Sequence, residues 1–322
     1  MPHIQTDDNV SLYVEDVGQG TAVVFAHEFA GDHRSWAPQV RYLSRRYRCI
    51  TYSARGYAPS EVPADVSKYS QQRARDDLRC VLDALGIERA HVVGLSMGAF
   101  AALHFGMAFG TAAAPVRALS LTLAGVGTGS HPAAYANFQR EATALADTIE
   151  REGMDKLAQT YGHGPARVQF RAKDPQGFAE FVQRLAEHPA LGSANTMRGY
   201  QAKRPSLYDL TDAIGAIKVP TLIMTGDEDE PCLEPSLMLK RVITTSQLAV
   251  LPGAGHAINL EEPESFNRLL AEFLAQVEQG ANFERDAHAK PMSILGPGAQ
   301  LLLQQPRGQH GPVAGKVGER VI

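Results

Sequence analysis

The sequence predicts an α/β fold in which a doubly wound, mostly parallel sheet is interrupted by a helical insertion. Short apolar runs alternate with amphipathic stretches over residues 1–130, the alternation stops over 131–209, and it resumes over 210–280. Alternating β and α segments form parallel sheets with right-handed crossovers and helices on both faces. We therefore expect an α/β core in two parts, 1–130 and 210–280, around a helical insertion at 131–209.

The strands are predicted from short runs of apolar and β-branched residues. Val10–Val17 alternates apolar and polar residues, as a half-buried strand does. The remaining runs are almost wholly apolar, which is typical of inner strands covered on both faces. They lie at Thr21–Ala26, Cys49–Tyr52, Val92–Val93, Leu119–Leu123, Val219–Gly226 and Gln247–Leu251.

Helices are predicted between these runs from the spacing of apolar residues and from helix stop signals. In the core they are expected at Ser35–Tyr47, Gln71–Leu85 and Pro263–Gln279, and in the insertion at Phe138–Glu150 and Phe178–Glu187. An insertion of this kind is typical of a lid over one end of a sheet, the alternative being a structural addition away from any site. Residues 281–322 are rich in Gly, Pro and Gln with little periodicity, so we expect a loosely structured tail.

Composition excludes several classes of function. A net charge of −4 over 322 residues and a pI near 6.3 give no basic surface for nucleic acid or anionic membrane. The three cysteines are widely spaced, which favours neither a disulfide framework nor a zinc site. The first residues lack a signal-peptide pattern, and no apolar stretch is long enough to span a membrane. We therefore expect a soluble, cytoplasmic protein, and the oligomeric state is left open.

A nucleophile is predicted at Ser96, within the pattern Gly94-x-Ser96-x-Gly98. The pattern follows an apolar strand and precedes the helix-like run 99–105, which is the context of a nucleophile elbow. Such an elbow holds the serine exposed on a sharp strand-to-helix turn, and the flanking glycines remove Cβ atoms that would clash. The alternative is a glycine-flanked serine in an ordinary turn.

A serine nucleophile needs a base, and the base needs an acid that orients it. In chains with a nucleophile elbow, the acid follows the serine in the sequence and the histidine follows the acid. The acidic group Asp227–Glu230 follows a strand, and of the histidines after it only His256 lies between a strand and a helix. We predict His256 as the base and prefer Asp229 as the acid. Asp227 is expected to continue the strand end, and Glu228 and Glu230 are expected to be solvated.

With these residues the chain resembles the α/β-hydrolase fold superfamily, in the lidded group of small esterases, lactonases and cofactor-free haloperoxidases. The resemblance covers residues 10–280 and is carried by Gly94–Gly98, Gly226–Asp229, Gly255-His256, Arg55-Gly56-Tyr57 with Ser60, and Pro220-Thr221-Leu222. It implies an eight-stranded sheet with a helical lid and a serine hydrolase that cleaves a small carboxylic ester or lactone through an acyl-enzyme. It implies a small-molecule substrate and neither a metal nor an organic cofactor.

The oxyanion hole is predicted from two backbone N–H groups. One belongs to Met97, directly after the nucleophile, and the resemblance implies the other at Phe29. Glu28 is a departure, since the family usually reads His-Gly-x-x-Gly where this chain reads His27-Glu28-Phe29-Ala30-Gly31. His27 and Glu28 are therefore possible site-lining residues. The carboxylate of Glu28 would repel an oxyanion if it pointed inward or orient a water if held back, and we expect it to face away.

The aromatic content of the insertion predicts a largely apolar pocket for the acyl group. The residues concerned are Tyr135, Phe138, Tyr161, Phe170, Phe178, Phe181 and Tyr208. The same triad also supports C–C bond hydrolysis or perhydrolysis, and some proteins with this triad act as ligand receptors with little turnover. Dehalogenase or epoxide hydrolase chemistry in this fold uses an aspartate nucleophile, and Ser96 argues against it.

Overall fold

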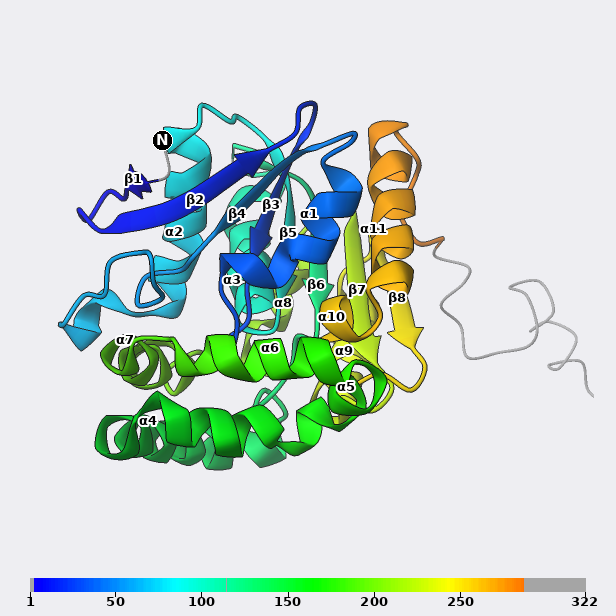
Figure 1. The fold of residues 1–322 in the computed structure, drawn as a ribbon. Coiled ribbons are helices and arrows are strands. Elements are labelled where there is room, and N and C mark those ends of the chain that lie inside the picture. The colour runs from blue at the N-terminus through cyan, green and yellow to red at the C-terminus, as the bar shows by residue number, and fades with distance from the viewer. Residues whose placement is uncertain (1–2, 114, 287–322) are drawn as a thin grey trace, which may run out of the picture. The chain divides into compact units, whose positions relative to one another are not determined.

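In the computed structural model, which describes residues 3–113 and 115–286, eight strands form one sheet with helices on both faces (Figure 1). The strands are β1 (His3–Gln5), β2 (Ser11–Val17), β3 (Ala22–Ala26), β4 (Arg48–Tyr52), β5 (Ala90–Leu95), β6 (Ala118–Ala124), β7 (Thr221–Gly226) and β8 (Ser246–Leu251). Their order is β1-β2-β4-β3-β5-β6-β7-β8. Strand β2 pairs antiparallel with both neighbours and all other pairs are parallel. The predicted doubly wound, mostly parallel sheet is confirmed.

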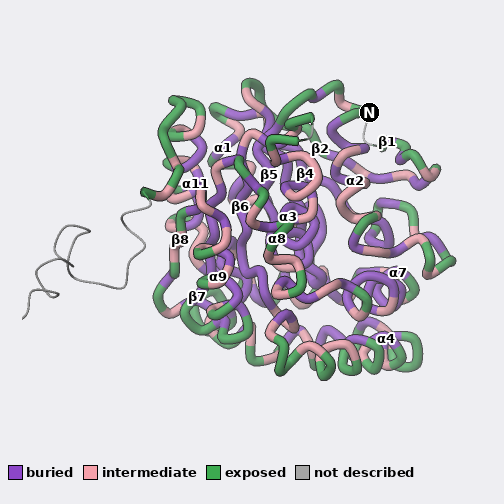
Figure 2. Tube along the Cα trace, turned by 180° about the vertical axis from the view of Figure 1, so that it is seen from behind, coloured by how far each residue is buried: buried purple, intermediate pink, exposed green. Residues whose placement is uncertain are grey.

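Two layers of helices cover the two faces of the sheet. The core helices are α1 (Ala37–Leu43), α2 (Gln71–Ala84), α3 (Met97–Phe109), α8 (Thr211–Gly215), α9 (Glu230–Val242), α10 (Ile258–Glu261) and α11 (Pro263–Glu278), with short 3-10 turns η1 (His33–Trp36) and η2 (Val66–Lys68). Helices α1 and α11 lie on one face and α3 and α8 on the other, as the opposite views in Figures 1 and 2 show. The inner strands are buried between two apolar clusters, one on each face.

A long helical insertion connects β6 to β7. It consists of α4 (Pro132–Thr160), η3 (Tyr161–His163), η4 (Pro165–Arg167), α5 (Val168–Lys173), α6 (Pro175–Ala186), α7 (Ala190–Asn195), η5 (Thr196–Gln201) and η6 (Leu207–Leu210). Its apolar side chains share a cluster with Phe29, Met97 and Ala257, which follow β3, β5 and β8. In Figure 1 the insertion (green) lies at the end of the sheet to which the arrowheads of β7 and β8 point. This carboxyl edge is where doubly wound sheets bind ligands.

Several elements differ from the sequence-based expectation. Strand β1 and helix α9 were not predicted, and the helix expected at Ser35–Tyr47 is the turn η1 followed by the shorter α1. Helix α4 spans 29 residues rather than 138–150, with a break at Gly153, where φ is 81°. The boundaries of the expected domains and the role of the insertion as a lid stay predictions. Most of the tail predicted at 281–322 lies outside the described residues.

Two structural features relate to the expectations from composition, namely the burial of the cysteines and the length and apolar content of the helices. Cys49, Cys80 and Cys232 are all buried free thiols, consistent with packing positions in the core. Among the helices of residues 3–113 and 115–286, none combines the length and the apolar content needed to cross a bilayer.

Candidate active site

Ser96 occupies a strained turn between β5 and α3. Its backbone has φ 52° and ψ −114°, a conformation that side-chain-bearing residues rarely adopt. A Cβ atom on Gly94 would lie 2.2 Å from the carbonyl oxygen of Gly98, and one on Gly98 would lie 2.0 Å from that of Ala26. Only glycine fits at both positions, so the close approach of helix, turn and neighbouring strand fixes the Gly-x-Ser-x-Gly pattern.

His256 and Asp229 lie together at the ends of two neighbouring strands. Asp229 follows β7 at the start of α9, and His256 lies in the loop after β8. The imidazole Nδ1 is 2.7 Å from Oδ2 of Asp229, and the two residues are 6% and 2% exposed. Asp227 points elsewhere, because its Oδ1 accepts a hydrogen bond from the Ala254 N–H at 3.2 Å.

The pairing shifts the pKa values of both groups. Burial lowers the pKa of His256, but the charge of Asp229 and its hydrogen bond outweigh burial, so the pKa lies above its ordinary value of 6.5. Burial raises the pKa of Asp229, but the charge and hydrogen bond of His256 outweigh burial and leave the pKa below 3.8. With Nδ1 directed at the carboxylate, Nε2 is the nitrogen available for proton transfer.

One cavity of about 570 Å³ brings most of the predicted site residues together. Ser96, Asp229 and His256 all line it. Phe29 from the loop after β3 contributes to the same wall. The other lining residues come chiefly from the helical insertion and include Phe138, Leu145, Tyr161, Arg167, Met197, Gln201 and Arg204. The volume is in the range of small-molecule sites.

The two amides predicted for an oxyanion hole have no acceptor. Among the residues that the structure describes, neither the Phe29 N–H nor the Met97 N–H forms a hydrogen bond. Met97 is the first residue of α3, where a helix leaves its N–H groups unpaired and adds a partial positive charge. Neither N–H group is therefore engaged by another described residue. Phe29 lines the cavity of Ser96, and Met97 lines a smaller cavity.

Glu28 faces neither solvent nor the cavity. It is 1% exposed, and its Oε2 forms an ion pair with Nη2 of Arg167 in the insertion. The φ angle of Glu28 lies outside the left-handed region, so glutamate in place of the family's glycine causes no backbone strain there. Glu28 is not among the residues that line the cavity, in keeping with the expectation that its side chain faces away, whereas its partner Arg167 does line it. The pairing neutralises the carboxylate that would otherwise repel an oxyanion.

The insertion also contacts the histidine loop directly. The N–H of His256 donates to the carbonyl oxygen of Ala166 at 3.2 Å. The neighbouring Arg167 holds Glu28 through the ion pair. One short segment of the insertion, 166–167, therefore contacts both the loop after β8 and the loop after β3.

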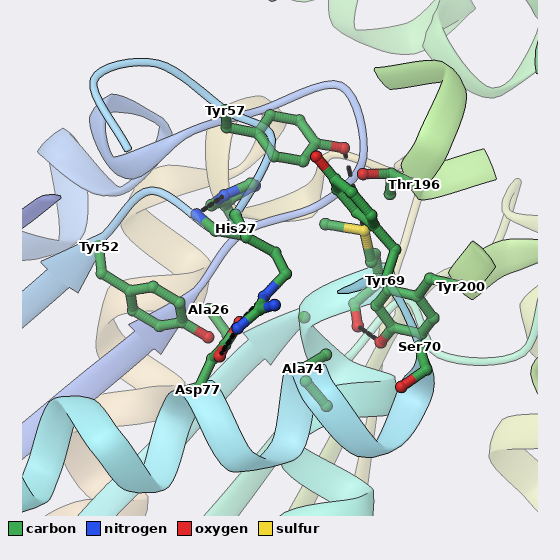
Figure 3. A pocket seen from close by; sticks show the side chains of 15 residues that line it. Ala26, His27, Tyr52, Tyr57, Tyr69, Ser70, Ala74, Asp77, Thr196 and Tyr200 are labelled. Carbon is green, nitrogen blue, oxygen red and sulfur yellow. Dashed lines mark hydrogen bonds and ion pairs between the residues drawn. The ribbon is translucent and has the colours of Figure 1, made fainter. Parts of the chain in front are cut away.

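His27 lies behind the oxyanion loop rather than in the main cavity. Its Nδ1 is 2.7 Å from the Glu28 carbonyl oxygen, and its Nε2 accepts from the Ala54 N–H at 3.0 Å. Burial lowers the pKa of His27 to about 4, so the ring is neutral. Figure 3 shows His27 beside Tyr57 at a separate cavity of about 30 Å³, which holds no more than a water or two. His27 therefore supports the loop and does not line the larger cavity.

The aromatic residues of the insertion divide into two groups. Phe138 and Tyr161 line the cavity, as expected of an acyl pocket. Phe170, Phe178 and Phe181 instead pack against one another, with ring centroids 5.8 to 6.2 Å apart. Only two of the seven aromatic residues therefore line the cavity, and an apolar acyl pocket stays a prediction.

Two arginines in the cavity wall were not predicted from the sequence. Arg167 and Arg204 are 2% and 4% exposed, although arginine is rarely so buried. Arg167 lies 139 positions from its partner Glu28. A local sequence pattern does not predict contacts between residues so far apart in the chain. The one available signal was Glu28, an acidic residue in place of the family's glycine, which would need a cation nearby if it were buried.

Asp229, His256 and Cys232 form the one cluster of metal-ligand type among the described residues, with ligand atoms within 4.8 Å of one another. His256 Nδ1 is already hydrogen-bonded to Asp229. The Cys232 thiol donates to the Gly125 carbonyl oxygen at 3.3 Å, and burial raises its pKa well above the ordinary value. A protonated thiol is a poor metal ligand, so the donor set favours a hydrogen-bonded pair over a metal site.

The sequence is similar to those of known proteins. The sequence profile of a family described as "alpha/beta hydrolase fold" matches residues 21–263. The chain is 30% identical to 3-oxoadipate enol-lactonase 1 of Acinetobacter baylyi over 270 residues, covering 84% of this chain and 94% of that protein. It is 28% identical to 2-hydroxy-6-oxo-6-phenylhexa-2,4-dienoate hydrolase of Burkholderia cepacia, covering 83% of this chain and 92% of the relative.

A solved structure shows the same fold. A thermophilic esterase from Thermogutta terrifontis, with malate bound, superposes with a TM-score of 0.73 at 26% identity. The match covers 85% of this chain and 98% of the esterase.

Proposed function

The chain belongs to the alpha/beta hydrolase fold family and is a hydrolase, and on that premise we propose that it cleaves a small carboxylic ester or lactone through an acyl-enzyme on Ser96. The single observation that carries the proposal is the meeting of Ser96 with the hydrogen-bonded pair His256–Asp229 in one cavity. A serine hydroxyl is a weak nucleophile unless a base takes its proton. Ser96 lines the cavity from a strained turn, as a nucleophile elbow requires.

The reaction proceeds in two halves. His256 Nε2 takes the proton of Ser96 as its Oγ attacks the carbonyl carbon, and Asp229 stabilises the imidazolium that forms. The N–H groups of Phe29 and Met97 bind the negatively charged oxygen. The imidazolium protonates the leaving alcohol, and water then attacks the acyl-enzyme with His256 again as base. The product is a carboxylic acid, and a lactone yields a hydroxy acid.

A second candidate is hydrolysis of a C–C bond in a vinylogous diketone. The relative from Burkholderia cepacia is named for the hydrolysis of a 2-hydroxy-6-oxo-dienoate, whereas that from Acinetobacter baylyi is named for an enol-lactone. Both named substrates carry a carboxylate. The same triad supports both reactions, and the products distinguish them. C–C hydrolysis leaves a new C–H bond on the released fragment, whereas ester or lactone hydrolysis leaves an O–H group there.

The test is a substrate profile of the wild-type protein and of Ser96→Ala across p-nitrophenyl esters, lactones and vinylogous diketones. We expect hydrolysis of esters or lactones by the wild type and a loss of about 10³-fold or more in kcat/KM for Ser96→Ala. Ser236→Ala is the matched control, because Ser236 is buried, lies outside the cavity and has an unpartnered hydroxyl. Turnover by Ser96→Ala at the wild-type rate would contradict the proposal.

A further inference from the structure

The cavity that contains Ser96 and His256 also contains a buried cation that has no acidic partner. Arg204 is 4% exposed and lines this cavity. Its Nη1 donates to Oε1 of Gln201 and its Nη2 to the carbonyl oxygen of Thr128. Among the residues that the structure describes, no carboxylate lies within ion-pair distance of Arg204.

Arg204 is held flat beside the helix that begins at the nucleophile. Its guanidinium carbon lies 3.8 Å from the ring centroid of Phe100 and 4.7 Å from that of Phe138. The Phe100 N–H donates to the carbonyl oxygen of Ser96 at 3.0 Å, so the two residues are one helical turn apart in α3. The guanidinium therefore packs against a side chain that lies one helical turn from the nucleophile.

The other deeply buried ionisable side chains of the cavity each have a partner. Asp229 pairs with His256, and Arg167 pairs with Glu28. Glu141 also lines the cavity, but it is exposed and accepts a hydrogen bond from Asn137 at 2.6 Å. Among the described residues that line this cavity, Arg204 is thus the deeply buried ionisable side chain without an acid–base partner.

An unpaired buried cation is costly unless something compensates it. Burial lowers the pKa of Arg204 to about 10, which expresses that cost. The hydrogen bonds to Gln201 and Thr128 use two of the five N–H groups of the guanidinium. Its planar set of donors matches a carboxylate, which accepts two parallel N–H bonds.

We propose that Arg204 binds a carboxylate of the substrate, so that the enzyme acts on esters or lactones whose acyl part carries a negative charge. This inference rests on the proposed function, because the carboxylate is bound in the cavity in which Ser96 attacks. The substrate carboxylate supplies the counter-charge that Arg204 lacks, and the guanidinium supplies the directional contact. The apolar groups of Phe138 and Met197 in the same wall accommodate the carbon chain between the carboxylate and the reacting carbonyl.

The test compares mono-p-nitrophenyl esters of glutarate, adipate and pimelate with the neutral p-nitrophenyl esters of pentanoate, hexanoate and heptanoate. Because a charge-assisted hydrogen bond contributes about 1.5–3 kcal/mol, we expect a preference in kcat/KM of about 10- to 100-fold for the charged ester of the best length. Arg204→Met should abolish that preference, whereas Arg204→Lys should keep part of it. No preference in the wild type, or an unchanged preference in Arg204→Met, would overturn the inference.

Arg140→Met is the matched control for loss of one positive charge. Arg140 lies on α4 of the same insertion, is exposed and does not line the cavity. It should keep the wild-type preference for the charged esters. A fall in preference equal to that of Arg204→Met would show a general electrostatic effect and overturn the inference.

A binding measurement separates this inference from the proposed function and from a folding defect. Calorimetric titration of Ser96→Ala with glutarate, adipate and pimelate needs no turnover. We expect saturable binding that weakens about 10- to 100-fold when Arg204→Lys or Arg204→Met is added. Arg204-dependent binding without ester hydrolysis by the wild type would contradict only the proposed function. Hydrolysis of neutral esters together with Arg204-independent binding would contradict only the carboxylate site.

Discussion

Arg167, in the helical insertion, forms a buried ion pair with Glu28, in the loop that follows β3. Both side chains are 2% exposed or less. The pair joins the segment that covers the carboxyl edge of the sheet to the loop that offers the Phe29 N–H to the cavity. Its energetic role is testable, because breaking a buried pair leaves one charge uncompensated.

We predict that Glu28→Gln and Arg167→Met each lower the free energy of unfolding by about 3–5 kcal/mol. The double variant should lose less than the sum of the two, because neither charge then remains buried alone. Chemical denaturation measures these values. Glu272→Gln is the control, since the Arg268–Glu272 pair is exposed on α11 and contributes about 0.3–0.5 kcal/mol. Additive losses in the double variant would show that the two side chains are not coupled.

The His256–Asp229 pair predicts a specific pH dependence of hydrolysis. The reaction needs neutral His256, whose pKa lies above 6.5 because Asp229 outweighs burial. Activity should therefore fall as the pH drops through that raised pKa. Asp229→Asn should move this acidic limb to lower pH, because burial alone lowers the pKa of His256, and should reduce kcat by about 10⁴-fold. An acidic limb at the same pH in both proteins would exclude the coupling.

The turn at Ser96 predicts that Gly98 accepts no side chain. A Cβ there would lie 2.0 Å from the backbone oxygen of Ala26, so the strand or the helix must move. We expect Gly98→Ala to lower the free energy of unfolding by about 1–3 kcal/mol or more and to abolish hydrolysis. Gly215→Ala is the control, because the closest atom to its Cβ would be 3.6 Å away. Full activity of Gly98→Ala would show that the turn does not need the close approach.

We predict that His27 affects catalysis by supporting the loop that carries Phe29, and that its own protonation does not shape the pH profile. His27→Ala removes the partner of the Ala54 N–H and of the Glu28 carbonyl oxygen, so the loop that carries Phe29 loses its support. We expect kcat to fall by about 10²-fold with a smaller change in KM, as for a misplaced catalytic group. Because burial lowers the pKa of His27 to about 4, the shape of the pH profile above pH 5 should persist. His104→Gln, which replaces a half-buried histidine on α3, is the control.

Local patterns made most of the sheet predictable. Inner strands such as β3 and β7 are short apolar runs between loops, a pattern that is visible in the sequence. Seven of the eight strands lie where such sequence patterns predicted them. Strand β1 has three residues and two exposed side chains, too little for a pattern. Helix α9 contains Pro231 and Pro235, which obscure its periodicity although a proline in the first turn is compatible with a helix.

Some residues of the candidate site could be predicted from the sequence and others could not. Ser96, Asp229 and His256 each follow a strand, so their positions could be predicted from the strand pattern and the chain order. The arginines could not, because their partners are tertiary: Arg204 contacts Thr128 from 76 positions away. Which side chains of the insertion enter the cavity depends on the packing of helices against the carboxyl edge, and aromatic content alone does not determine it.

The most direct test of the central claim is covalent labelling with a fluorophosphonate, read by intact mass and peptide mapping. We predict one phosphonyl group per chain on Ser96 and no label in Ser96→Ala. Labelling of His256→Ala should be slower than that of the wild type by about 10³-fold or more. A label on another residue, or equal labelling rates in the wild type and His256→Ala, would contradict the claim that His256 activates Ser96.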